Sequence, residues 1–155
     1  IIKKGLTPVF VDVEPGTYIA DINQIEQAIT NKTKAIIAVD LMGNMPEWDE
    51  IIDICKSKNI FVIEDSAEGI GAKYKKCKAG TFGEISLFSF NATKLIMSGQ
   101  GGAFCTDDKE LYDKVKNCML NIDETRGITI RKSFKKYDWE TMCPVYDQLF
   151  SSLIK

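Results

Sequence analysis

An acidic residue and a lysine follow two apolar runs of this sequence, at positions that would bring them together in a folded sheet. Asp65 ends the run FVIED, and Lys94 comes just after the run ISLFSF. If the two runs are neighbouring parallel strands, a carboxylate and an amine converge at the sheet edge where open α/β sheets bind their ligands.

This pairing is the one that pyridoxal phosphate chemistry needs. A lysine amine holds the cofactor, and an acidic partner keeps the pyridine nitrogen protonated so that the ring can accept carbanion charge. Taken singly, Asp65 also reads as the cap of a following helix and Lys94 as a solvated loop residue. The residues around them favour the first interpretation.

Composition excludes several other kinds of site. The chain has no histidine, so it cannot assemble a Ser-His-Asp or Cys-His nucleophile or a histidine-bound zinc ion. Twenty basic and twenty-two acidic residues give a net charge of −2, which offers no electrostatic argument for a nucleic-acid or membrane partner. No apolar run is long enough to cross a bilayer. We expect no metal site.

The cysteines indicate a reducing compartment. There are five, an odd number, none in a C-x-x-C arrangement, and no signal peptide is visible. We therefore expect a cytoplasmic protein with reduced thiols. Cys55 and Cys118 are expected in amphipathic helices, as core residues.

Hydrophobic periodicity predicts alternating strands and helices. Strands are expected over residues 8–13, 34–40, 60–63, 85–90 and 103–106, helices over 21–30, 47–58 and 107–120, and a hairpin over 69–80. This order predicts an α/β fold with a mainly parallel sheet and helices on both faces. Asp21 is the expected N-cap of the first helix, and Asn59 the expected end of the second.

The stretch EDSAEGIGAKYKKCKAGTFGEISLFSFNATKLIMSGQGG resembles the DegT/DnrJ/StrS family of pyridoxal phosphate-dependent sugar aminotransferases. That family carries an ED-A-x-(Q/E/H) segment, FSF, a Schiff-base lysine and GEGG, in this order. The upstream segment TKAIIAVDLMGNMPEWDEI is similar to its perosamine synthetase branch. The resemblance covers about residues 5–120 and implies the large, cofactor-binding domain of fold type I transferases.

The resemblance implies a role for each matching residue. Lys94 would be the Schiff-base lysine and would shuttle the substrate proton, and Asp65 would pair with the pyridinium nitrogen. Glu68 would lie near the ring hydroxyl, Ser89 would bind the cofactor phosphate, and Asn91 would line the rim. By their own sequence context, Glu68 also reads as an exposed helix residue, and Ser89 as a packed residue bonded to backbone.

The implied reaction moves an amino group, usually from glutamate, to a keto carbon of a nucleotide-linked deoxysugar, in a homodimer. Related sugar dehydratases carry histidine in place of the lysine, so Lys94 favours transamination. Two other classes stay open: a truncated or regulatory relative that binds cofactor or sugar nucleotide without turnover, and a generic α/β domain for another phosphorylated ligand.

Two departures from the family pattern concern Asp40 and the C-terminal region. Asp40 stands where relatives often have histidine. Near Tyr146 the expected Asn and Arg of a phosphate-binding segment are missing. The chain also lacks an initial Met and ends inside an expected helix. We therefore expect a fragment, with residues 1–122 forming part of the large domain, and with an irregular loop and the start of a helix over 123–155.

Overall fold

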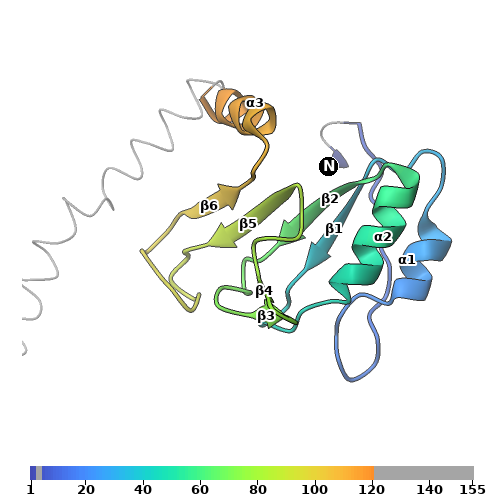
Figure 1. The fold of residues 1–155 in the computed structure, drawn as a ribbon. Coiled ribbons are helices and arrows are strands. Elements are labelled where there is room, and N and C mark those ends of the chain that lie inside the picture. Colours follow the sequence, from blue (N-terminus) through green and yellow to red (C-terminus); the bar gives the residue numbers. More distant parts are fainter. Residues whose placement is uncertain (3–4, 121–155) are drawn as a thin grey trace, which may run out of the picture. The chain divides into compact units, whose positions relative to one another are not determined.

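The computed structural model describes residues 1–2 and 5–120 (Figure 1). They fall into two units, one of residues 1–109 and one that begins at Glu110. The second unit is described through Leu120 and consists there of most of helix α3 (Lys109–Leu120). The expected loop and helix over 123–155, including Tyr146, lie outside the described residues.

A four-stranded sheet forms the centre of the first unit. Its strands are β1 (Ala35–Val39), β2 (Phe61–Asp65), β5 (Ile85–Ser89) and β6 (Gly102–Cys105), in the order β1-β2-β5-β6. β1, β2 and β5 are parallel, and β6 pairs with β5 in the antiparallel direction. The α/β class with a mainly parallel sheet is therefore confirmed. The expected hairpin is also present, as β3 (Lys73–Tyr74) and β4 (Cys77–Lys78).

The first two helices begin and end where local sequence predicts. Helix α1 (Ile22–Ala28) starts after Asp21, whose carboxylate accepts hydrogen bonds from the backbone N–H groups of Asn23 and Gln24. Helix α2 (Trp48–Lys58) ends at Asn59, which takes the left-handed conformation with φ 53°. Both ends agree with the expectation from the sequence.

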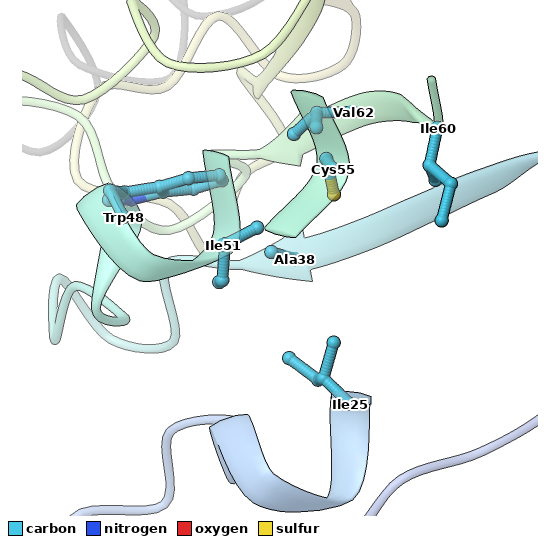
Figure 2. Close-up of a cluster of buried hydrophobic side chains, with 7 residues drawn as sticks. All are labelled: Ile25, Ala38, Trp48, Ile51, Cys55, Ile60 and Val62. Carbon is cyan, nitrogen blue, oxygen red and sulfur yellow. The ribbon is translucent and has the colours of Figure 1, made fainter. Parts of the chain in front are cut away.

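A core of apolar side chains joins these helices to β1 and β2 (Figure 2). The cluster contains Ile25, Ala38, Trp48, Ile51, Cys55, Ile60 and Val62, all less than 6% exposed. Trp48 is fully buried, and its ring stacks on that of Phe82 with centroids 5.1 Å apart. This packing fixes α2 over the sheet, so the loops at the ends of β1 and β2 are attached to a rigid body.

The opposite face of the sheet is open in the first unit. Both α1 and α2 lie on one face (Figure 1), while Ile37, Val39 and Leu87 on the other are 49%, 41% and 39% exposed. The second helical layer expected from the sequence is therefore not supplied by the described residues of 1–109. Among the residues that the structure describes, no helix has the length and apolar content needed to cross a membrane.

Two sequence expectations are wrong. Residues 8–13 form no strand; only Val13 makes an isolated bridge, with Ala20, and Phe10 is 90% exposed. A β-branched run gives only a propensity, and a strand also needs a hydrogen-bonded neighbour, which this run lacks among the described residues. Cys118 is exposed rather than in a core, since α3 has no buried residue. The apolar stripe of α3 alone does not establish that the helix is buried.

Candidate active site at the carboxyl edge of the sheet

The carboxyl ends of β2 and β5 meet at one edge of the sheet, as the sequence predicts. The strands are adjacent and parallel, and Asp65 lies opposite Leu87 in their register. Beyond β5 the chain makes a loop over residues 90–101 and returns through the antiparallel β6. The loop is closed by hydrogen bonds from Phe90 N to Gly101 O (2.9 Å) and from Ser98 N to Phe90 O (3.0 Å).

Lys94 lies in this loop, and its amine is held by Glu68. Lys94 Nζ donates to Glu68 Oε1 at 2.9 Å, and the two side chains are 23% and 35% exposed. Glu68 Oε2 accepts from the backbone N–H of Met42 at 3.1 Å. Three loops, following β1, β2 and β5, are thus linked through one carboxylate. Glu68 is on a turn and not in a helix, so its contact with Lys94 is a tertiary one.

The remaining candidate residues at this edge have local partners. Asp65 Oδ1 accepts from Ala67 N at 3.0 Å, so Asp65 closes a turn instead of capping a helix. Ser89 Oγ accepts from Asn91 N at 3.4 Å, and Asn91 Oδ1 accepts from Thr93 N at 3.2 Å. The structure brings Lys94 directly to Glu68, whereas Asp65, Ser89 and Asn91 occupy the same edge without a recorded contact to the amine.

The charge of Glu68 is stabilised in this arrangement. The hydrogen bond from Lys94, followed by that from the Met42 backbone, lowers the pKa of Glu68 below its usual value. Both contacts favour the ionised carboxylate. The edge therefore holds an amine paired to a carboxylate, with a second carboxylate on the neighbouring strand.

A buried carboxylate that was not expected from the sequence, Glu64, lies directly behind Asp65. Glu64 is fully buried and accepts hydrogen bonds at both oxygens. Its donors are Gly80 N (2.5 Å), Phe82 N (2.8 Å), Gly83 N (3.3 Å), Ser66 Oγ (3.0 Å) and Ser86 Oγ (2.6 Å). Burial alone would raise the pKa of Glu64, but these donors outweigh it and lower the pKa. The strand alternation in FVIED could have found it, since Glu64 shares the face of buried Val62.

Asp40 belongs to the same buried group. It follows β1, is fully buried, and accepts from Trp48 Nε1 at 3.1 Å, while Ser66 Oγ contacts its other oxygen. Burial raises the pKa of Asp40 to about 6, against the opposing effect of Ser66, and the charge of Glu64 raises it further. Asp40 is thus a structural neighbour of the turn that carries Glu68.

Other reactive groups of the described residues lie away from this edge. Burial, with a smaller effect of Glu84, raises the pKa of the Cys55 thiol to about 11, so it is a core residue and not a nucleophile. A hollow of about 420 Å³ next to it is lined by residues of α2 and the start of β2, and by no candidate site residue. No group of potential metal ligands occurs among residues 1–2 and 5–120.

Comparison with known sequences identifies relatives of this chain. The model of the DegT/DnrJ/EryC1/StrS aminotransferase family matches residues 1–140. GDP-perosamine synthase of Escherichia coli O157:H7 is 51% identical over 110 residues, which cover 71% of this chain and 30% of that protein. GDP-4-keto-6-deoxy-D-mannose 3-dehydratase of Yersinia pseudotuberculosis is 37% identical over 139 residues, covering 86% of this chain and 35% of that protein.

Solved structures agree. The aminotransferase PseC of Helicobacter pylori, which acts in the biosynthesis of pseudoaminic acid, superimposes with a TM-score of 0.71 at 36% sequence identity. The match covers 74% of this chain and 31% of that one. The chain therefore spans about a third of the length of the relatives it matches. On the family match and the shared fold, this chain belongs to the DegT/DnrJ/EryC1/StrS aminotransferase family.

Proposed function

We propose that this chain contributes the reactive lysine of a pyridoxal phosphate-dependent enzyme that transfers an amino group, from glutamate, to a keto carbon of a nucleotide-linked deoxysugar. One observation carries the proposal. Lys94 presents a half-buried amine, 2.9 Å from Glu68, at the sheet edge where the strand bearing Asp65 also ends. An amine held in place beside a carboxylate-bearing strand is the arrangement that this chemistry uses.

The groups at this edge fit the cofactor. Lys94 offers the amine that bonds to its aldehyde, and Asp65 a carboxylate for the ring nitrogen. Ser89 offers a hydroxyl for the phosphate, Glu68 a carboxylate near the ring hydroxyl, and Asn91 an amide at the rim. When bound, pyridoxal phosphate withdraws electrons from the carbon that bears the substrate amine.

The protein's own residues then hold and move protons. Lys94 would act as the general base and acid: once the substrate amine has released it from the cofactor, it would take the proton that leaves the substrate α-carbon and deliver it again. Before the cofactor binds, Glu68 holds the Lys94 amine through the 2.9 Å contact. The Asp65 carboxylate would stabilise positive charge on the ring nitrogen of the bound cofactor.

The relatives support the proposed substrate class. A perosamine synthase and a GDP-4-keto-6-deoxy-D-mannose 3-dehydratase are both similar to this chain, and both are named for GDP-linked sugars or their products. Lys94 favours amino transfer over dehydration, because dehydration in this family goes with histidine at that position. Sugar dehydration is the second candidate, since the dehydratase matches over 139 residues.

Further parts of this proposal concern the whole protein. We place residues 1–122 in the cofactor-binding large domain and residues 123–155 in a loop and helix that lead to a smaller domain. A cytoplasmic homodimer belongs to the same proposal. A relative that binds cofactor or sugar nucleotide without turnover is the competing reading, and catalytic assays distinguish the two.

Cofactor binding is tested on the 155-residue chain. The chain is incubated with pyridoxal phosphate, reduced with borohydride and mapped by mass spectrometry. We expect a visible absorption band that reduction removes, with a stable adduct on Lys94. Lys76→Ala, which removes an exposed lysine of the hairpin, should leave the adduct unchanged, and Lys94→Ala should abolish it. An adduct spread over several surface lysines, or none on Lys94, contradicts the proposal.

Amino transfer is tested in a chimera in which this chain replaces the matching segment of the E. coli O157:H7 GDP-perosamine synthase. Glutamate and a GDP-4-keto-6-deoxysugar are supplied, and amino sugar is measured by mass. Lys94→Ala should lower the rate by at least about a hundredfold, the usual scale for loss of a general acid–base group. A chimera that binds cofactor at Lys94 but makes only the deoxygenated sugar supports dehydration instead.

A further inference from the structure

Asp40, Glu64 and Ser66 form a buried cluster in which there are more hydrogen-bond contacts than hydrogens to fill them. Ser66 Oγ carries one hydrogen, yet it contacts two buried carboxylates, Asp40 Oδ2 and Glu64 Oε1. Asp40, Glu64 and Ser66 are each 0% exposed, so water does not supply a second proton. If both carboxylates were ionised, one of these contacts would place two oxygen acceptors against each other without a hydrogen between them.

The surroundings decide which carboxylate is protonated. Glu64 is surrounded by donors, three backbone N–H groups and the Ser86 hydroxyl in addition to Ser66, all of which favour its ionised form. Asp40 has one other donor, Trp48 Nε1, at its Oδ1. Glu64 is the charged group that faces Asp40. The other neighbours of Asp40 are the Trp48 indole of α2, and Ser66 and Gly69 of the turn after β2.

We propose that Asp40 is a positioning residue in mildly acidic solution: there it keeps its proton and donates it to Ser66 Oγ, so that Ser66 donates in turn to Glu64 and the turn over residues 66–69 is held against the end of β1. In this arrangement every contact contains one hydrogen. The pair of carboxylates carries one negative charge in place of two, which the buried location favours.

The same turn carries one residue of the proposed site. It follows Asp65 directly and contains Glu68, the partner of Lys94. Gly69 packs on Asp40 so closely that an added Cβ would lie 2.8 Å from the Asp40 Cβ, and Gly69 N donates to Ser66 O at 3.0 Å. Loss of the Asp40 proton therefore loosens the support under Glu68. Only this last link, from the turn to cofactor chemistry, rests on the proposed function.

The test needs no cofactor, so its failure is distinct from failure of the proposed function. Trp48 reports on Asp40 through its indole N–H, and Trp139→Phe leaves it the only tryptophan of the chain. The indole N–H and the amides of Ser66 and Gly69 are followed by NMR from pH 4.5 to 8. Asp40→Asn keeps both contacts, since its amide donates to Ser66 and its carbonyl accepts from Trp48. Asp53→Asn, an exposed change on α2, is the matched control.

We expect one shared midpoint near pH 6 for the Trp48 indole and the Ser66 and Gly69 amides, and the same midpoint in Asp53→Asn. In Asp40→Asn this titration should be absent, with the signals fixed at their low-pH positions. Signals that stay constant from pH 5 to 7 in the parent chain, or that titrate unchanged in Asp40→Asn, overturn the assignment of the proton to Asp40. An indole that titrates while the Ser66 and Gly69 amides do not overturns the positioning role.

Discussion

Glu68 Oε1 accepts a hydrogen bond from Lys94 Nζ at 2.9 Å, across 26 residues of sequence. The contact joins the turn after β2 to the loop after β5, and the Met42 N–H joins the loop after β1 to the same carboxylate. Glu68 thus holds three loops of the sheet edge together. The pKa of Glu68 therefore reports whether these contacts between the three loops are formed.

The first prediction concerns the titration of Glu68. Because Lys94 is the main cause of the lowered pKa of Glu68, Lys94→Ala should raise that pKa toward 4.5, the ordinary value. Carboxyl ¹³C NMR measures it directly. Lys76→Ala is the control and should leave the pKa of Glu68 low. An unchanged pKa in Lys94→Ala would show that the contact does not form in solution.

The second prediction concerns the pH dependence of stability. The pKa of Asp40 is raised to about 6 in the folded chain, so its stabilising effect is complete below its unfolded value of 3.8 and is lost as the pH rises through 6. Glu64 has a lowered pKa, so its stabilising effect is present above 4.5 and is lost as the pH falls. The joint contribution of the two groups should therefore be greatest near pH 4 to 4.5, and the Asp40 part of it should fall as the pH rises from there to about 6.

Urea unfolding at several pH values measures this profile. Between pH 4.5 and 7 the parent chain should lose stability, by an amount on the order of 2 kcal/mol, because the pKa of Asp40 is about two units above its unfolded value. Asp40→Asn should remove most of that loss, and Asp53→Asn should retain it. A parent chain that gains stability over this range would contradict the assignment.

The third prediction concerns Trp48. Trp48→Ala removes a fully buried ring that stacks on Phe82 and should cost about 3–5 kcal/mol of unfolding free energy. Trp48→Phe retains a ring but leaves Asp40 Oδ1 without its donor, and should cost about 1–3 kcal/mol. Phe10→Ala removes a ring that is 90% exposed and should change stability by less than about 0.5 kcal/mol. Chemical denaturation followed by circular dichroism measures the unfolding free energy of the three variants. Equal losses in all three would contradict the burial of Trp48 in this core.

The fourth prediction concerns Gly83, which packs against the backbone of β2 and β5. An added Cβ would lie 2.6 Å from Ile85 O and 2.7 Å from Glu64 N. Gly83→Ala should therefore push the paired strands apart and cost about 1–3 kcal/mol, with shifted amide signals in β2 and β5. Gly16→Ala is the control, because Gly16 has φ +89° but open space around it, so its cost should come from backbone strain without changes in the sheet.

The sequence predicted most of the sheet because its strands have strong local signals. The runs at β1, β2 and β5 are apolar. Helix α1 precedes β1 and α2 separates β1 from β2, with clear ends at Asp21 and Asn59, and alternation of this kind favours parallel neighbours. Residues 8–13 have the same composition but no partner in the described chain. Pairing partners are a property of the whole fold, so this failure could not be seen from the run itself.

The candidate site was predicted in part for a similar reason. Asp65 and Lys94 follow strands, and strand ends can be placed from the sequence. The link from Lys94 to Glu68 depends on how two loops turn, and the link from Trp48 to Asp40 depends on how α2 lies on the sheet. Neither the loop conformations nor the helix packing has a periodic signal. Glu64 was within reach, because an acidic residue in phase with Val62 on one strand face has to be buried.

The antiparallel direction of β6 has a consequence for how this family can diversify. Because β6 reverses, the loop over residues 90–101 leaves and re-enters the sheet at one edge, and its two ends are tied together at Phe90 and Gly101. A parallel β6 would have needed a crossover connection, usually a helix packed on the sheet, and any change in that connection would disturb the packing of the sheet face. Lys94 instead lies in a loop whose two ends are hydrogen-bonded to each other. The residues of such a loop can be replaced, and the chemistry at the sheet edge changed, while the sheet itself stays the same.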